Sequence, residues 1–166
     1  VTLLDKDVCY IHEKILSDGL LTFTGSHEKL AGLLWERLLA FTNKTQISVL
    51  NYIRYETEDY CEGMFSIMTD MKKDKELRLS AIRYFGRYFY APAKEALSSF
   101  AADKNPLNWE YAAVSASSLS KYPGEEVTEI LTNMMHSPNW YVRYNAAVSL
   151  GVLGLYYRIL AQTIGG

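Results

Sequence analysis

Residues 137–151 read Ser137-Pro-Asn-Trp-Tyr-Val-Arg-Tyr-Asn-Ala-Ala-Val-Ser-Leu-Gly151, and they are the clearest copy of a repeated pattern that predicts helices. Its core, Val-Arg-x-x-Ala-Ala-x-x-Leu-Gly at 142–151, recurs at 77–86 as Leu-Arg-x-x-Ala-Ile-x-x-Phe-Gly. A weaker copy lies between them at 109–118, where Glu110 replaces the arginine and Ser117-Ser118 replace Leu-Gly. Apolar residues at spacings of three and four indicate helices with one buried face.

A second helix follows each of these copies. Its apolar positions, exemplified by Met64, Leu97 and Ile130, are also spaced by about 33 residues. One helix pair cannot bury its apolar face alone, whereas stacked pairs bury a continuous core. The sequence therefore predicts an all-α solenoid of about five antiparallel helix pairs.

The predicted boundaries follow from this period. An N-terminal helix pair, capping or divergent, occupies 1–42, with helices at 3–17 and 28–41 and a helix cap at Ser26. Four repeats follow at 43–73, 74–105, 106–138 and 139–166, the last of them truncated. Their helices are predicted at 44–55 with 58–70, 74–89 with 92–103, 107–121 with 124–136, and 139–153 with 155–164.

Small residues mark close approaches between the predicted helices. Ala81, Ala113 and Ala146 occupy the same repeat position, where a neighbouring helix can come near. Three glycines, at 86, 151 and 154, are expected near the ends of first helices. A helix end favours glycine because it needs a positive φ or a close crossing.

Composition excludes several classes of protein. Half of the chain is apolar (49%), 22% is charged and the formal net charge is −2, which is typical of a folded domain. Sequence-blind DNA binding needs many cations, so a near-neutral chain argues against a nucleic-acid partner. No apolar run is long enough to cross a membrane, and no signal peptide begins the sequence. We expect a cytoplasmic location with no membrane contact in this sequence, although an anchor elsewhere in a longer, bacterial protein stays open.

The repeated pattern resembles HEAT repeats, in the short bacterial form related to the repeats of phycobilisome lyases. The family pattern is a capping Asp or Asn, then Val-Arg, two small residues and Leu-Gly, and residues 137–151 match it best. The resemblance covers the last three repeats, is weak at 43–73 and is absent before residue 43. It implies a right-handed superhelix whose second helices line the concave face.

The resemblance also implies a structural ladder in which an arginine follows the capping residue by four positions. Asp74 with Arg78 and Asn139 with Arg143 have this spacing. Each arginine is expected to pair with its capping residue or with a neighbouring backbone carbonyl.

No catalytic constellation stands out in the sequence. No serine or cysteine is accompanied by a plausible base, and no phosphate-binding glycine loop occurs. Two His-Glu pairs, His12-Glu13 and His27-Glu28, resemble the iron ligands of deoxyhypusine hydroxylase, a HEAT-class enzyme. They lie outside equivalent repeat positions, so we expect no catalytic residues, metal or cofactor.

Two surfaces are candidates for binding a partner. The second helices align polar residues into a small, mildly acidic strip on the concave face, suited to a peptide that carries Lys or Arg. The strip comprises Glu62, Ser66, Glu95, Ser99, Thr128 and Thr132. Tyrosines of the first helices could form a second ridge, namely Tyr84, Tyr88, Tyr111, Tyr141 and Tyr144.

The sequence thus favours a non-catalytic scaffold module for a protein or peptide partner, within a larger protein. The alternative is an enzyme or enzyme-accessory HEAT protein, either lyase-like or metal-dependent. A nucleic-acid-binding domain is the third hypothesis. An exposed apolar edge after the last repeat also predicts self-association of the chain.

Overall fold

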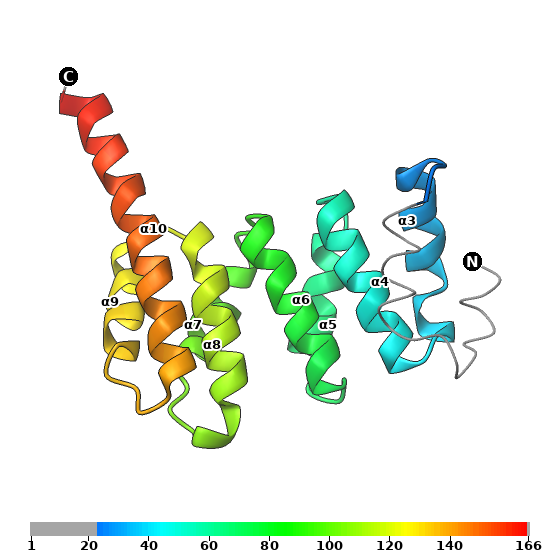
Figure 1. The fold of residues 1–166 in the computed structure, drawn as a ribbon, viewed down its shortest axis with the longest axis horizontal. Coiled ribbons are helices and arrows are strands. Elements are labelled where there is room, and N and C mark those ends of the chain that lie inside the picture. The colour runs from blue at the N-terminus through cyan, green and yellow to red at the C-terminus, as the bar shows by residue number, and fades with distance from the viewer. Residues whose placement is uncertain (1–22, 166) are drawn as a thin grey trace. The chain divides into compact units, whose positions relative to one another are not determined.

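The computed structural model describes residues 23–165, and every regular element in that range is a helix (Figure 1). The predicted all-α fold is therefore confirmed over this range. The chain divides into two compact units, Val1–Ala81 and Ile82–Gly166, with the boundary inside helix α6. The helix predicted at 3–17 and the cysteine and His-Glu pair within it lie outside the described residues.

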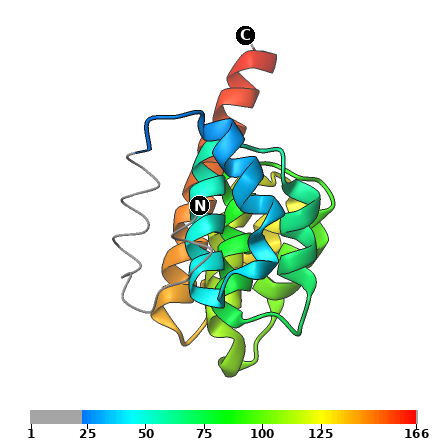
Figure 2. The ribbon, with the colours of Figure 1, turned by 90° about the vertical axis from the view of Figure 1, so that its right-hand side faces the viewer.

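Within residues 23–81, the first unit contains three complete α-helices and the first half of α6. The elements are α3 (His27–Glu36), the 3-10 turn η1 (Leu38–Ala40), α4 (Asn43–Glu56), α5 (Cys61–Thr69) and α6 (Lys75–Arg87). Helices α3 and α4 lie side by side (Figure 2). Their facing residues, including Leu34 and Ile53, are fully buried. The Trp35 ring packs closely over Gly63 and lies 4.7 Å from the Tyr60 ring, which joins α3 to α5.

The second unit begins with the end of α6. It continues with α7 (Ala93–Ala102), η2 (Pro106–Asn108), α8 (Trp109–Ser118), η3 (Leu119–Lys121), α9 (Glu125–Met134) and α10 (Trp140–Gly165). Helix α10 packs along both α8 and α9, and α7 packs against the same two helices. Ala113 and Ala146 are buried between these helices, as their repeat position predicts.

Hydrogen bonds spaced by one repeat join successive helix pairs in this unit. Ser118 Oγ donates to the Ile82 carbonyl at 2.9 Å, and Ser149 Oγ donates to the Ala116 carbonyl at 2.6 Å. Tyrosine hydroxyls make a second series, in which Tyr122 accepts from the Tyr90 N–H at 3.2 Å. Tyr157 accepts from the Gly124 N–H at 2.6 Å in the same way. Ser118, one of the two serines that replace Leu-Gly in the middle repeat, therefore holds neighbouring helices together.

The prediction of two final helices is wrong. Residues 140–165 form one continuous helix, with Gly151 and Gly154 in its interior. A glycine inside a helix costs only about 1 kcal/mol, so it does not end a helix without a cap or a proline. Gly124 is the one glycine with a positive φ among the described residues. Gly86 does mark a close crossing, because an added Cβ would lie 2.9 Å from Ser118 Oγ.

Three helix caps were predicted, at Ser26, Asp74 and Asn139, and the structure confirms them. Ser26 accepts a hydrogen bond from the Lys29 N–H at 3.3 Å. The Asp74 carboxylate accepts from Glu76 N–H at 3.0 Å, and Asn139 Oδ1 accepts from Tyr141 N–H at 2.9 Å. Asp74 and Asn139 are thus helix caps, since each satisfies backbone donors that the first turn leaves unpaired.

The two ladder arginines bond to backbone carbonyls, one of the two expected arrangements. Arg78 Nε donates to the Met68 carbonyl at 3.1 Å, and its side chain is buried. Arg143 Nη1 donates to the carbonyls of Ser137 at 2.7 Å and Pro138 at 3.1 Å, and it is half-buried. Each arginine therefore closes the loop before its own helix.

Candidate functional site

The predicted strip is distributed over both units. Glu62 and Ser66 are exposed on α5 in the first unit. In the second unit Glu95 and Ser99 are exposed on α7, and Thr128 and Thr132 lie on the neighbouring helix α9. The two threonines line a shallow hollow of about 550 Å³, together with Glu125, Glu129, Asn133 and Tyr157.

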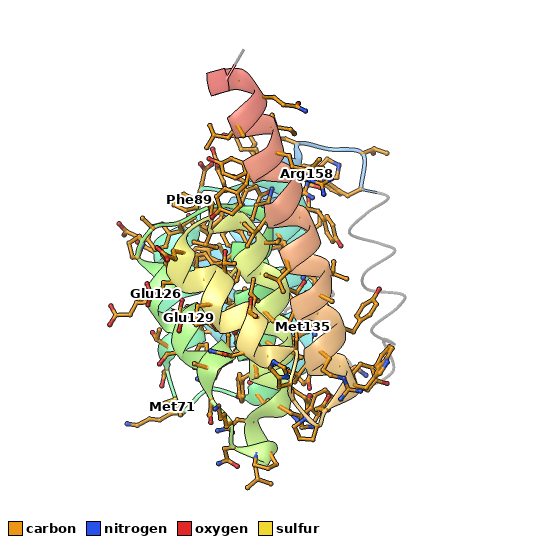
Figure 3. The ribbon with its side chains drawn as sticks, turned by 90° about the vertical axis from the view of Figure 1, so that its left-hand side faces the viewer. Met71, Phe89, Glu126, Glu129, Met135 and Arg158 are labelled. Carbon is orange, nitrogen blue, oxygen red and sulfur yellow. The ribbon has the colours of Figure 1, made fainter. Side chains whose placement is uncertain are left out.

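Most of the polar groups that line the shallow hollow are hydrogen-bond acceptors. Glu125 and Glu129 contribute carboxylates, and Glu126 adds a third on the same helix; Figure 3 shows Glu126 and Glu129 extending from α9. Thr128 Oγ1 donates to the Gly124 carbonyl at 3.0 Å and Thr132 Oγ1 to the Thr128 carbonyl at 2.7 Å. Their hydroxyl protons are thus used within the helix, which leaves oxygen lone pairs toward the hollow.

Charge on the two second helices of this unit is mostly negative. Helices α7 and α9 carry four glutamates, at 95, 125, 126 and 129, against one lysine, Lys94. Carboxylates and hydroxyl lone pairs together are suited to ammonium and guanidinium groups. The lining of the hollow is therefore complementary to positive charge.

A second hollow, of about 560 Å³, was missed by sequence reasoning. It lies between the loop that joins α7 to α8 and the loop that joins α9 to α10. Its apolar lining includes Trp109, Ile130, Met134 and Val142, and its polar lining includes Lys104 and His136. Asn133 lines both hollows, so they adjoin at this residue of α9.

The loop at the edge of the second hollow is held by Asp103. Its carboxylate accepts hydrogen bonds from the Asn105 N–H at 2.8 Å and from Asn108 Nδ2 at 2.7 Å. These bonds stabilise the ionised form and lower the pKa of Asp103. The conformation of the loop between α7 and α8 is therefore stabilised by hydrogen bonds within the loop.

Exposed aromatic rings continue from this hollow. Trp109, which lines it, stacks on Tyr141 with centroids 5.5 Å apart. Trp140 contacts Tyr141 at 4.9 Å and stacks on Tyr144 at 5.3 Å. Trp140, Tyr141 and Tyr144 are each more than half exposed. Residues 140 and 144 are one helical turn apart, so their spacing could have predicted that the two rings lie together. The predicted ridge contained only tyrosines and therefore omitted Trp140.

The tyrosine ridge is therefore only partly present. Tyr84 is fully buried and belongs to the core, so its inclusion in an exposed ridge is wrong. Tyr88 and Tyr111 are half-buried. Whether a tyrosine at a repeat position is buried or exposed depends on which neighbouring helix packs over it. The local sequence does not specify that neighbour.

His27, of the second His-Glu pair, belongs to a polar cluster in the first unit. His27 Nδ1 lies 2.6 Å from the Tyr52 hydroxyl and 3.7 Å from a Glu56 carboxylate oxygen. Burial, and secondarily the Glu56 charge, raises the pKa of Tyr52 to about 12. Within residues 23–165 no three His, Cys, Asp or Glu side chains gather as a metal site.

This cluster is expected to make the first unit sensitive to alkali. Because Tyr52 has a pKa of about 12 when folded and an ordinary value of 10.0, its contribution to stability is complete below pH 10. That contribution is lost as the pH rises toward 12. We expect Tyr52→Phe to show a smaller loss of stability over this range in urea denaturation. Parallel pH profiles of the wild type and the variant would contradict this assignment.

No helix among residues 23–165 has the length and apolar character to cross a bilayer. No protein-family model, curated protein or solved structure matches this chain.

Proposed function

We propose that this chain is a non-catalytic scaffold module that binds a basic peptide segment of a partner protein along α9. The observation that carries the proposal is the shared residue Asn133, at which the shallow, acidic hollow and the second, apolar hollow adjoin. Charge supplies selectivity at one end of this surface, and burial of an apolar side chain supplies affinity at the other.

The length of α9 sets the spacing of the peptide motif. Glu125 and Asn133 are separated by eight residues of helix, or about 12 Å at 1.5 Å per residue. An extended peptide covers about 3.3 Å per residue, so about four residues span this distance. The preferred ligand therefore carries Lys or Arg, and an apolar side chain about four residues away that contacts Trp109 and Met134.

At the level of the fold, we propose a right-handed α-solenoid of HEAT-like helix pairs. Three features support this proposal. The hydrogen bonds of Ser118 and Ser149 join residues about one repeat apart, and the repeated alanines are buried. The helices that carry Arg78 and Arg143 each begin with a capping residue. The last repeat contributes one long helix instead of the expected pair. A solenoid of this kind presents its second helices as a binding surface, which agrees with the placement of the hollows on α9.

The test is a direct binding measurement with a synthetic peptide. The probe is a fluorescein-labelled peptide with two adjacent lysines and a leucine four residues later. Its binding is measured by fluorescence anisotropy. We expect the double substitution Glu125→Lys with Glu129→Lys to weaken binding by about tenfold or more, because each attraction becomes a repulsion. Added salt should weaken wild-type binding as well.

A matched control separates the site from the net charge of the protein. Glu36→Lys with Glu58→Lys makes the same charge change at exposed positions of the first unit. This variant should bind the probe nearly as well as the wild type. Circular dichroism verifies that both variants are folded. Equal binding by the wild type and the α9 variant would refute the proposal, as would equal binding of a probe in which glutamates replace the lysines.

A further inference from the structure

The two hollows along α9 differ in the polar groups that line them. The shallow hollow, toward the start of α9, is lined by the carboxylates of Glu125 and Glu129. The second hollow lies at the end of α9, and its polar lining includes Lys104 and His136. Figure 3 shows Glu129 on α9 and Met135 at the end of the helix. A ligand that lies along α9 therefore meets carboxylates at one end and a lysine at the other.

Lys104 is available to a ligand of the second hollow. Its side chain is exposed, and among residues 23–165 it pairs with no carboxylate. Asp103 lines the same hollow, but its two oxygens accept hydrogen bonds from the Asn105 N–H and from Asn108 Nδ2. Asp103 keeps its negative charge, so the attraction of Lys104 for an anion is short-range and needs direct contact. Its ammonium group has three N–H donors for such a contact.

The loop between α9 and α10 adds neutral hydrogen-bond donors to this hollow. Ser137 Oγ accepts from the Asn139 N–H at 3.2 Å, which leaves its hydroxyl proton for another acceptor. The His136 ring carries an N–H in either neutral tautomer. Both Ser137 and His136 line the hollow. The two loops thus contribute donors to a mainly apolar lining, which is complementary to a carboxylate beside an apolar side chain.

We propose that the second hollow binds the C-terminal residue of the partner's basic segment, with its terminal carboxylate on Lys104. The apolar side chain of that residue lies against Trp109 and Met134. This inference rests on the proposed function, because the same segment places Lys or Arg in the shallow hollow. A C-terminal residue carries its side chain and its carboxylate on one Cα atom, so a single hollow can bind both. Terminal carboxylates are a recurrent target of peptide-binding sites.

The opposite charges at the two ends of α9 also set the direction of the bound peptide. The basic residues precede the C-terminal residue, so the peptide runs from the shallow hollow to the second hollow, parallel to α9. Recognition then depends on where the motif lies in the partner. The same residues inside a longer chain lack the carboxylate, and the chain would have to continue out of the second hollow.

Fluorescence anisotropy with three probes tests this inference. Each probe is labelled at its N-terminus and contains two adjacent lysines and a leucine four residues later. The first ends at the leucine with a free carboxylate, and the second ends there with an amide. The third continues past the leucine with a glutamate and ends with an amide. We expect the wild type to bind the free acid about fivefold more tightly than either amide, because an exposed ion pair contributes modestly.

Lys104→Met assigns the carboxylate to its partner. This variant removes the ammonium group and keeps a long aliphatic side chain, so it should bind the free acid and the corresponding amide with equal affinity. The matched control is Lys121→Met, which makes the same change at an exposed lysine just after the other end of α8. The control should retain the preference for the free acid. Circular dichroism verifies that both variants are folded.

The outcomes separate this inference from the proposed function. Equal binding of the free acid and its amide by the wild type overturns the inference, as does a preference that persists in Lys104→Met. Binding of the glutamate-extended probe as tightly as the free acid would overturn the C-terminal assignment. In each of these cases the proposed function stands if Glu125→Lys with Glu129→Lys still weakens binding. A wild type that binds none of the probes refutes both proposals.

Discussion

Replacing Arg78 with alanine is expected to lower the free energy of unfolding of the first unit by about 3 kcal/mol. Arg78 is 4% exposed, and its Nε donates to the Met68 carbonyl at 3.1 Å. Its Nη2 also lies 3.2 Å from Met71 Sδ. Alanine would leave a cavity and a carbonyl without this donor, and both effects destabilise a buried site.

Arg143→Ala is the matched control, because Arg143 has the same motif position. Its hydrogen bonds go to the carbonyls of Ser137 and Pro138, but its side chain is half-buried, so water can replace it. We expect a loss of about 1 kcal/mol for this variant. Urea denaturation followed by tryptophan fluorescence reports on both units, since Trp35 belongs to the first and Trp109 and Trp140 to the second. The assignment fails if Arg78→Ala is no more destabilising than Arg143→Ala.

Replacing Gly86 with alanine is expected to destabilise the second unit by about 2 kcal/mol. The new methyl group would lie 2.9 Å from Ser118 Oγ and 3.2 Å from Ser118 Cα. A backbone atom cannot turn aside, so α6 and α8 would have to separate. Separation would also lengthen the hydrogen bond from Ser118 Oγ to the Ile82 carbonyl, which is now 2.9 Å.

Gly154→Ala makes the same chemical change but is expected to stabilise the protein. Gly154 lies inside α10, and an added Cβ would meet nothing within 4 Å. Alanine should therefore stabilise the helix by about 0.5–1 kcal/mol through its higher helix propensity. Thermal melting of both variants checks the pair. Destabilisation by Gly154→Ala, or none by Gly86→Ala, would show that helix packing here differs from the structure.

The helices from residue 43 onward were predictable because their signals are local. Apolar spacing, Asp74 and Asn139 as caps, and the recurring alanines each act within a few residues. The end of the chain was not predictable in this way. A glycine at 151 or 154 is compatible with a helix end or with a helix interior, and only the conformation of the whole helix distinguishes them.

The candidate site was predictable in part for a similar reason. Thr128 and Thr132 were placed on an exposed acidic helix face, and they do line a hollow with Glu125 and Glu129. The apolar hollow beside it could not be predicted, since its two loops are one repeat apart in the sequence. The loops meet only because α8 and α10 pack together.

Local sequence was enough to predict that this protein is helical, where most helices begin, and which positions repeat, because these properties depend on neighbouring residues. Tertiary structure alone decided burial. Arg78 and Arg143 share a motif, yet one is buried and the other half-buried. Tyr84 and Tyr144 share a class of position, yet one is in the core and the other is exposed. Burial depends on which helix lies across a residue, and that is a property of packing between distant segments.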